Sequence, residues 1–258
     1  MTKLGEWVLA SLSRDPAAPD YRVESYDSKH EDLETYKHVL LRTFPGLTEK
    51  IRGGSVLDVG CAEGFESLAL SQLGAKHVHG IDIRIPELNE RIRMEHKDGD
   101  VTFSLMNAQE MTFADGEFDA VITCGSFEHF SEPDKVLKEC KRVVRRGGHV
   151  FLTSGVWAHP WGAHMNFFTH VPWVQYIFSE RTIMEVRKRY RSDGAERFHE
   201  VEGGLNKVGV GSFLKIAKDV GLSIDYLRLQ PVKGLNILTK PPLLREFFTN
   251  LIIAELRK

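Results

Sequence analysis

Residues 56–64, Val-Leu-Asp-Val-Gly-Cys-Ala-Glu-Gly, decide the fold of this chain, together with Asp82 at the end of the next apolar run. They predict a buried strand and a turn at Gly60 that opens a helix, after which a second strand ends on the carboxylate. Such a unit lets the backbone approach a nucleoside while the carboxylate binds both ribose hydroxyls. A dinucleotide fingerprint starting at Gly60 needs glycines at positions 62 and 65, which hold alanine and phenylalanine, and no P-loop lysine follows. The turn therefore favours a nucleoside without a pyrophosphate over NAD or ATP.

Short apolar runs alternate with helical stretches along the chain, which predicts an α/β fold with a parallel sheet covered on both faces. The expected strands lie near residues 55–60, 77–82, 101–106, 118–123, 148–154, 223–229 and 235–239. The expected helices lie near residues 3–12, 30–43, 64–73, 86–97, 133–145, 179–191, 208–220 and 241–258.

Five segments in register resemble the class I S-adenosylmethionine-dependent methyltransferases of the small-molecule, methyltransferase-11-like type. They are residues 58–64, 107–108, 113–123, 126–133 and 143–152. The first loop of that family runs Asp-x-Gly-x-Gly-x-Gly, and Ala62 stands at its middle glycine. The resemblance implies a doubly wound, mostly parallel, seven-stranded Rossmann-like sheet that ends in a hairpin, with N-terminal helices and a large lid insertion after the fifth strand.

The resemblance also implies S-adenosylmethionine as cosubstrate and assigns its contacts residue by residue. Asp58 lies under the first turn and helps to hold the amino group, Asp82 accepts bonds from the ribose hydroxyls, and Ile83 packs on the adenine. Backbone contacts to the methionine half come from Gly60, Cys61, Ala62 and Gly64. Asn107 and Ala108 meet the adenine edge. Cys124 and Gly125 pass near the sulfonium.

The expected chemistry is an in-line displacement on a sulfonium, which needs alignment more than acid catalysis. A hydroxyl acceptor needs a base, and His129 is the first candidate because it follows the fourth strand, close to the methyl group. His159, His164 and His170 are the next candidates, since an imidazole titrates near neutrality. The alternative is that Glu-His at this position only shapes the cofactor pocket.

A divalent metal ion is a further alternative for the cofactor set. Ubiquinone-pathway O-methyltransferases and small-RNA 2′-O-methyltransferases carry Glu-x-x-Glu-His after this strand, where the ion acidifies the acceptor hydroxyl. Here Gly125 replaces the first carboxylate, so Glu128 and His129 need His159 or His164 to complete a site. We therefore assign no metal ligand.

Residues 155–207 form an insertion where an α/β connection normally takes two to six residues. Residues 156–173 hold three Trp and three His among eighteen residues, which favours an aromatic substrate pocket over a locally packed loop. We expect residues 1–50 to form a helical cap, either over the cofactor or on the sheet, and residues 51–154 to form the cofactor-binding core. Residues 208–240 complete this core with a helix and the hairpin, and residues 241–258 form an amphipathic helix. That helix docks on the domain, forms a homodimer contact or touches a membrane.

The composition favours a cytoplasmic enzyme with a small-molecule substrate. The chain has 258 residues and a net charge of −2, which gives no global electrostatic basis for nucleic-acid binding. It has no apolar run long enough to span a membrane and no secretory signal, and its three cysteines are too few for a disulfide framework. We expect methyl transfer to a small-molecule hydroxyl oxygen. The alternatives are an amine nitrogen, a metal-assisted RNA 2′-hydroxyl, and a cofactor-binding regulatory subunit without turnover.

Overall fold

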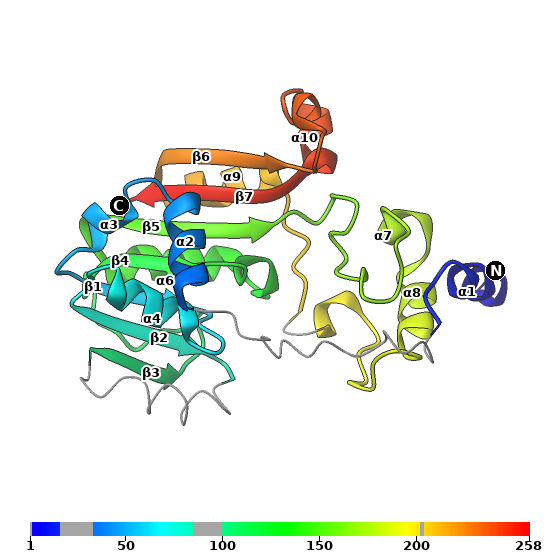
Figure 1. Cartoon of the computed structure of the whole chain (residues 1–258), viewed down its shortest axis with the longest axis horizontal. Helices are drawn as coiled ribbons and strands as arrows, with labels where there is room; N and C mark the ends of the chain where they lie inside the picture. The colour runs from blue at the N-terminus through cyan, green and yellow to red at the C-terminus, as the bar shows by residue number, and fades with distance from the viewer. Residues whose placement is uncertain (1, 16–32, 85–99, 202–203) are drawn as a thin grey trace.

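The computed structural model describes residues 2–15, 33–84, 100–201 and 204–258. Its centre is one seven-stranded sheet with the order β3-β2-β1-β4-β5-β7-β6, in which β7 runs antiparallel to the other six strands (Figure 1). The strands are β1 Ser55–Val59, β2 His77–Asp82, β3 Val101–Leu105, β4 Phe118–Thr123, β5 Val144–Gly155, β6 Ser223–Pro231 and β7 Thr249–Arg257. The expected Rossmann-like sheet is confirmed.

Helices cover both faces of this sheet, because neighbouring residues of each central strand are buried on opposite sides. In β1, Val56 packs with α2, α3 and α4, whereas Leu57 packs with α6 and α9. The helices are α1 Thr2–Ser11, α2 Leu33–Thr43, α3 Leu47–Ile51, α4 Phe65–Gln72, α6 Pro133–Val143, α7 Val174–Ile177, α8 Glu180–Arg187, α9 Val210–Val220 and α10 Pro242–Phe248. Three short 3-10 helices are η1 Phe127–His129, η2 Phe198–Glu200 and η3 Asn236–Thr239. The expected helix at 86–97 lies outside the described residues.

The segment after β5 packs around an apolar cluster of its own. Phe168, Ile183 and Met184 are almost completely buried in it, and Leu9 of α1 joins them. Helix α1 therefore lies against α8, far from the sheet, while α2 packs on α4 (Figure 1). Helix α1 thus completes the lid, and helix α2 covers the sheet. Helix α8 ends at Arg187, four residues before the expected end.

The C-terminal prediction was wrong in two places. The expected strand at 235–239 is replaced by η3 at 236–239, and the expected helix at 241–258 ends at Phe248, after which β7 begins at Thr249. Residues 252–256 are all buried in the sheet between β5 and β6, so the apolar side chains of this strand do not alternate with exposed polar ones, and only Glu255 interrupts the apolar run. The apolar spacing of such a run also fits a helix face, which explains the error.

None of the described helices combines the length and the hydropathy that a bilayer crossing needs. The boundaries proposed at residues 50, 154, 207 and 240 remain predictions.

Candidate active site

The carboxyl ends of β1, β2 and β4 meet at one edge of the sheet and bring the first turn, Asp82 and the segment after β4 together. The amides of Gly60 and Cys61 donate to the carbonyl of Ile81 at 2.8 and 3.1 Å. From the other side, Ser126 Oγ donates to the carbonyl of Gly60 at 3.0 Å. The turn is therefore held between the two neighbouring strand ends, which is where ligands bind in open α/β sheets.

The backbone of this turn needs residues without bulky side chains. Gly60 and Gly64 have φ angles of 80° and 81°, and Ala62 has a φ of 42°. A Cβ on Gly60 would lie 2.5 Å from both Cβ and Oγ of Ser126. Gly60 thus serves two purposes, since it allows a left-handed conformation and leaves room for the segment after β4.

Asp82 faces the first turn. Its Oδ2 accepts a bond from the amide of Ala62 at 3.0 Å, and its Oδ1 accepts one from the amide of Arg84 at 2.9 Å. The carboxylate is partly exposed, so both oxygens can still accept from hydroxyls of a ligand.

Asp58 lies completely buried beneath the turn. Its Oδ2 accepts a hydrogen bond from Ser67 Oγ at 2.6 Å, whereas its Oδ1 has no hydrogen-bond partner. Burial raises the pKa of this carboxyl, and the nearby Asp82 raises it further. Oδ1 is therefore the atom that Asp58 has left for a ligand amino group or a water.

Glu66 is a second acid in this region that the sequence reasoning missed. Burial raises the pKa of its carboxyl, the charge of Asp58 adds to the effect, and a hydrogen bond with Cys124 opposes it. Asp58 near the end of β1 and Glu66 at the start of α4 share one site of low dielectric constant, which disfavours ionisation of both carboxyls. The sequence feature that could have identified Glu66 is an acidic residue in the first turn of the helix that follows the glycine turn.

The remaining predicted cofactor residues lie along the same edge. Cys61 is 5% exposed, and burial together with Asp58 raises the pKa of its thiol, so it is a small packed side chain and not a nucleophile. Cys124 is partly exposed, and burial likewise raises the pKa of its thiol. The amide of Gly125 donates to Thr153 Oγ1 at 2.9 Å.

On the far side of Asp82, the predicted adenine residues follow β2 and β3. Ile83 is 60% exposed, Asn107 is exposed and Ala108 is buried. Asn107 Oδ1 accepts a bond from the amide of Gln109 at 3.0 Å, which leaves its NH2 group available. An open apolar side chain and an exposed amide at this position can contact a base.

His129 at the end of η1 is clamped by the end of the lid. Its Nδ1 lies 2.7 Å from the carbonyl oxygen of Gly204, and Asn206 Nδ2 donates to the carbonyls of Phe127 and Phe130 at 2.7 and 2.9 Å. Because a carbonyl only accepts, Nδ1 carries the proton of the neutral ring. The lone pair of Nε2 is then available to accept a proton.

The four candidate histidines have different surroundings. The rings of His129 and His164 lie 5.3 Å apart at 63°, and burial lowers the pKa of His164, as does the neighbouring His129. His159 is 7% exposed, burial lowers its pKa to about 4, and its Nδ1 accepts from the amide of Trp161 at 3.2 Å. His159 therefore holds a turn, while the structure brings His129 and His164 together. His170 lies apart and contacts Arg14.

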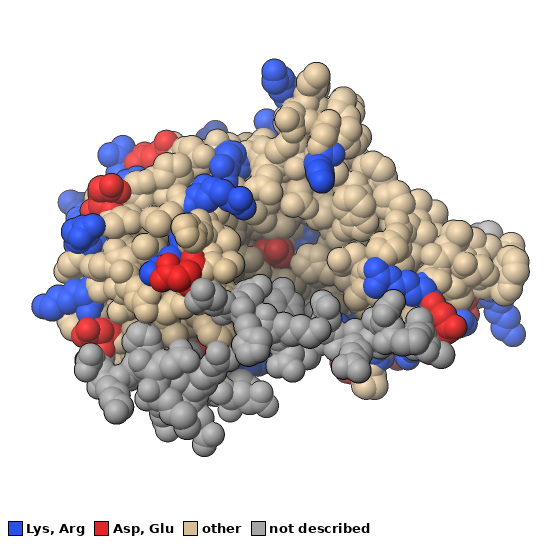
Figure 2. Space-filling view, viewed as in Figure 1, with Lys and Arg blue, Asp and Glu red and all other residues tan. Residues whose placement is uncertain are grey.

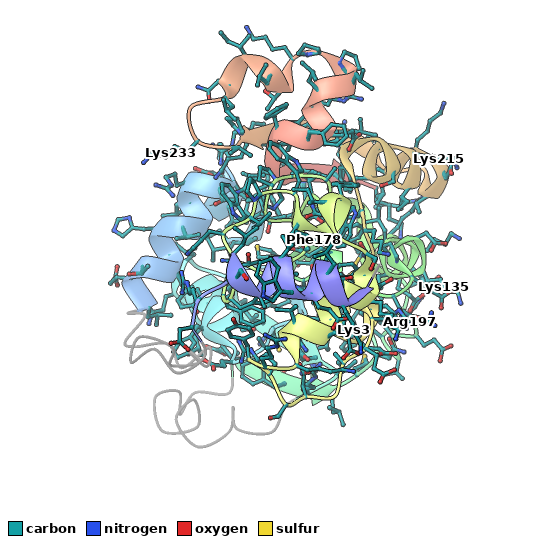
Figure 3. The ribbon with its side chains drawn as sticks, turned by 90° about the vertical axis from the view of Figure 1, so that its right-hand side faces the viewer. Lys3, Lys135, Phe178, Arg197, Lys215 and Lys233 are labelled. Atoms are coloured by element: carbon teal, nitrogen blue, oxygen red, sulfur yellow. The ribbon has the colours of Figure 1, made fainter. Side chains whose placement is uncertain are left out.

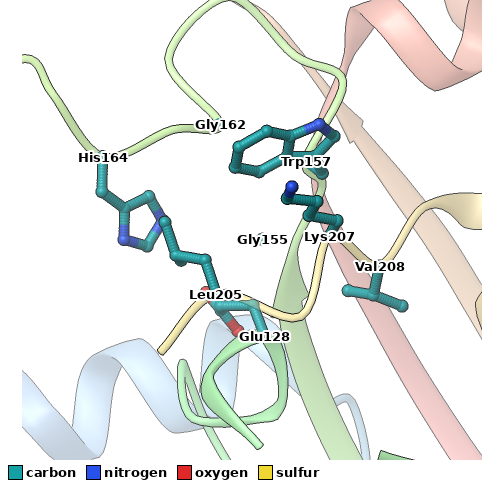
Figure 4. A pocket seen from close by; sticks show the side chains of 8 residues that line it. All are labelled: Glu128, Gly155, Trp157, Gly162, His164, Leu205, Lys207 and Val208. Atoms are coloured by element: carbon teal, nitrogen blue, oxygen red, sulfur yellow. The ribbon is translucent and has the colours of Figure 1, made fainter. Parts of the chain in front are cut away.

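A small recess opens between η1, the end of β5 and the lid (Figure 4). Its lining residues are Glu128, Gly155, Trp157, Gly162, His164, Leu205, Lys207 and Val208. Glu128 is 9% exposed, and its Oε2 is buried without a hydrogen-bond partner. Lys207 Nζ lies 5.3 Å from the centre of the Trp157 ring. The recess thus combines an unpaired carboxylate oxygen, an imidazole and an aromatic wall.

Comparisons with known proteins agree with this geometry. A family profile described as Methyltransferase domain matches residues 57–152. An uncharacterized methyltransferase from Mycobacteroides abscessus is 28% identical over 210 residues, which cover 80% of this chain and 77% of that protein. A ubiquinone biosynthesis O-methyltransferase from Pseudomonas paraeruginosa is 36% identical over 112 residues, but these cover only 40% of this chain and 45% of that protein.

The profile match over residues 57–152 and these relatives support a class I S-adenosylmethionine-dependent methyltransferase. The crystal structure of such an enzyme from Mesorhizobium loti has the same fold, with a TM-score of 0.60 at 16% identity over 88% of this chain and 100% of that one. The methyltransferase therefore uses S-adenosylmethionine as its cosubstrate. The glycine turn, the Asp82 carboxylate and the unpaired Asp58 Oδ1 fit a nucleoside with an amino-acid tail.

In the part of the chain that the structure describes, the residues considered for a metal site do not form a three-donor cluster. Among the described residues, the three-donor cluster with ligand atoms within 4.8 Å of one another consists of His149, Asp225 and Glu255 on β5, β6 and β7. Glu128 and His129 are not part of it, and the Nδ1 of His129 is used on a carbonyl. In the distant cluster, Glu255 is already bonded to Lys50. We derive no step through a metal ion.

Proposed function

We propose that this methyltransferase methylates a hydroxyl oxygen of a small molecule that binds between η1 and the lid, with His129 as the base. The observation that carries the proposal is the 2.7 Å bond between His129 Nδ1 and the carbonyl of Gly204. It fixes the neutral tautomer whose Nε2 can take a proton. The ring of His164 lies 5.3 Å from that of His129 and forms the neighbouring wall of the site.

The cosubstrate, when bound, supplies a methyl group on a sulfonium that is already an activated leaving group. The protein then has to align an oxygen nucleophile and remove its proton. His129 takes the hydroxyl proton on Nε2, and the carbonyl of Gly204 holds the imidazolium in place through Nδ1–H. The Asp82 carboxylate and the first turn orient the nucleoside, and the backbone near Cys124 and Gly125 lies beside the reacting centre.

The acceptor site that we propose is the recess of Figure 4. The ring of Trp157 provides an apolar wall, and the unpaired Oε2 of Glu128 can accept a hydrogen bond from a second polar group of the acceptor. The similarity to the Pseudomonas ubiquinone biosynthesis O-methyltransferase supports oxygen as the acceptor atom.

The test is turnover with a panel of phenols, aliphatic alcohols and amines, read as release of S-adenosylhomocysteine. We expect phenols or alcohols to be methylated, and His129→Ala to lower turnover by about 10²–10⁴-fold with unchanged affinity for the cosubstrate. His170→Ala is the matched control, because this lid histidine contacts Arg14 outside the recess and should leave turnover unchanged. Full activity of His129→Ala would refute the assignment.

An amine acceptor is the second candidate, and one observation favours it. The unpaired carboxylate oxygen of Glu128 suits an ammonium group. An amine attacks only after it loses its proton, which His129 can also accept. Methylation of amines alone in the panel would establish this candidate in place of the hydroxyl.

A further inference from the structure

The connection between β6 and β7 is much longer than a hairpin needs. It runs from Val232 to Phe248 and contains η3 and α10, whereas hairpin loops normally take two to five residues. This excursion stands out from the sheet as a protrusion above the lid (Figures 1 and 3). A long ordered excursion at a sheet edge that the fold does not require calls for a separate explanation.

The protrusion exposes large apolar side chains. Ile237 is 75% exposed, Leu243 is 79% exposed and Phe247 is 38% exposed. The lid continues this surface, because the rings of Tyr176 and Phe247 lie 6.0 Å apart and Ile177 beside it is 61% exposed. We name these five residues the apolar ridge. Contiguous exposed apolar side chains of this size mark an interaction surface.

The charge around the apolar ridge has one sign. Lys233 and Lys240 are exposed on the protrusion (Lys233 is labelled in Figure 3). Its single acid, Glu246, is turned inward, where it accepts hydrogen bonds from the amides of Val210 and Gly211 at 2.8 and 2.7 Å. Figure 2 accordingly shows basic and no acidic side chains on the visible face of the protrusion. The outward charge is therefore positive.

We propose that the apolar ridge, flanked by Lys233 and Lys240, docks the enzyme on an anionic lipid membrane. Apolar side chains enter the boundary between headgroups and acyl chains, and lysines next to them are attracted by the negative surface potential. A second copy of the chain fits this surface less well. In a two-fold contact the same patch meets itself, which places these lysines against their own counterparts without an acid to pair with.

The inference goes beyond the proposed function and does not depend on the acceptor, because it is tested without any cosubstrate. The full chain is sedimented with vesicles of phosphatidylglycerol and phosphatidylcholine. We expect binding that weakens as salt rises, because exposed charges are then screened. Ile237→Ser/Leu243→Ser should lower the affinity at least tenfold, about 1.4 kcal/mol, and Lys233→Glu/Lys240→Glu should lower it to a similar extent.

The matched control is Leu105→Ser at the opposite edge of the sheet, where this leucine is 70% exposed, and it should bind vesicles like the wild type. Circular dichroism and light scattering accompany each variant to report fold and oligomeric state. Absence of wild-type binding to the vesicles would overturn the proposal, as would wild-type affinity in the apolar double variant. A dimer that dissociates in that variant while vesicle binding persists would assign the ridge to self-association and overturn it as well.

Discussion

Replacing Gly60 by alanine tests whether the first turn is built as the structure describes. Alanine at a φ of 80° costs about 1–2 kcal/mol, because the left-handed conformation brings Cβ close to the carbonyl oxygen. The new Cβ also lies 2.5 Å from Oγ of Ser126. Ser126 Cβ lies equally close and does not move when the side chain rotates, so the backbone after β4 must shift. The bond of Ser126 to the carbonyl of Gly60, which contributes about 1 kcal/mol, is then lost. We expect a total loss of about 2–3 kcal/mol in the free energy of unfolding.

The assay combines urea unfolding with calorimetric titration of S-adenosylhomocysteine. Because Ser126 moves at the edge where the cosubstrate binds, the affinity of Gly60→Ala should fall at least tenfold. Gly53→Ala is the matched control: its φ is 68°, but a Cβ there has no heavy atom within 4 Å. That variant should lose about 1–2 kcal/mol of stability and keep its affinity.

A double variant, Gly60→Ala/Ser126→Gly, removes the clash and keeps the strained φ. Its free energy of unfolding should exceed that of Gly60→Ala by the part that the contact with Ser126 costs. Equal affinity of Gly60→Ala and Gly53→Ala for S-adenosylhomocysteine would refute the reasoning, because the ligand would then not depend on the position of this turn.

Two further predictions concern ionisable groups. Arg187 is 1% exposed, and its hydrogen bonds lower the pKa of Asp193 to about 2, so this pair stabilises the fold above pH 3.8 and the contribution is lost as the pH falls toward 2. Asp193→Asn should lower the free energy of unfolding at pH 7 by about 1–2 kcal/mol, a value discounted because Asp193 is 38% exposed. The variant should also lose less stability than the wild type as the pH falls from 3.8 to about 2. An unchanged loss of stability over this acid range would contradict the prediction. Burial, with Asp58, raises the pKa of Glu66 to about 8, so stability should fall as the pH rises from 4.5 through 8. Glu66→Gln, which stays neutral, should reduce this fall in melting temperature, and an identical pH profile would exclude the shift.

The central strands and the first turn could be predicted because their signals are local. The run before Gly60, the acid at position 82 and the spacing between them are set by neighbours in the sequence. The last strand could not be predicted in this way. Residues 251–254 are apolar without alternation, and only their pairing with β5 and β6 in the sheet reveals that they are extended.

The candidate site was predictable in its residue types but not in its partners. His129 was identified from its place after the fourth strand, yet its tautomer depends on Gly204, which is 75 residues away. The role of His159 depends on its burial and on its local bond to Trp161. Glu66 was missed because the sequence does not reveal that its carboxyl shares a buried site with Asp58. Burial and long-range contacts, more than residue identity, decide what these side chains can do.

A crystal structure of the chain with S-adenosylhomocysteine tests the central claim most directly. The account predicts that the ribose hydroxyls bind the Asp82 carboxylate, that the amino-acid tail lies on the turn from Gly60 to Gly64, and that the sulfur faces Nε2 of His129. A ribose away from Asp82, or a sulfur directed away from His129 and the recess behind it, would contradict it.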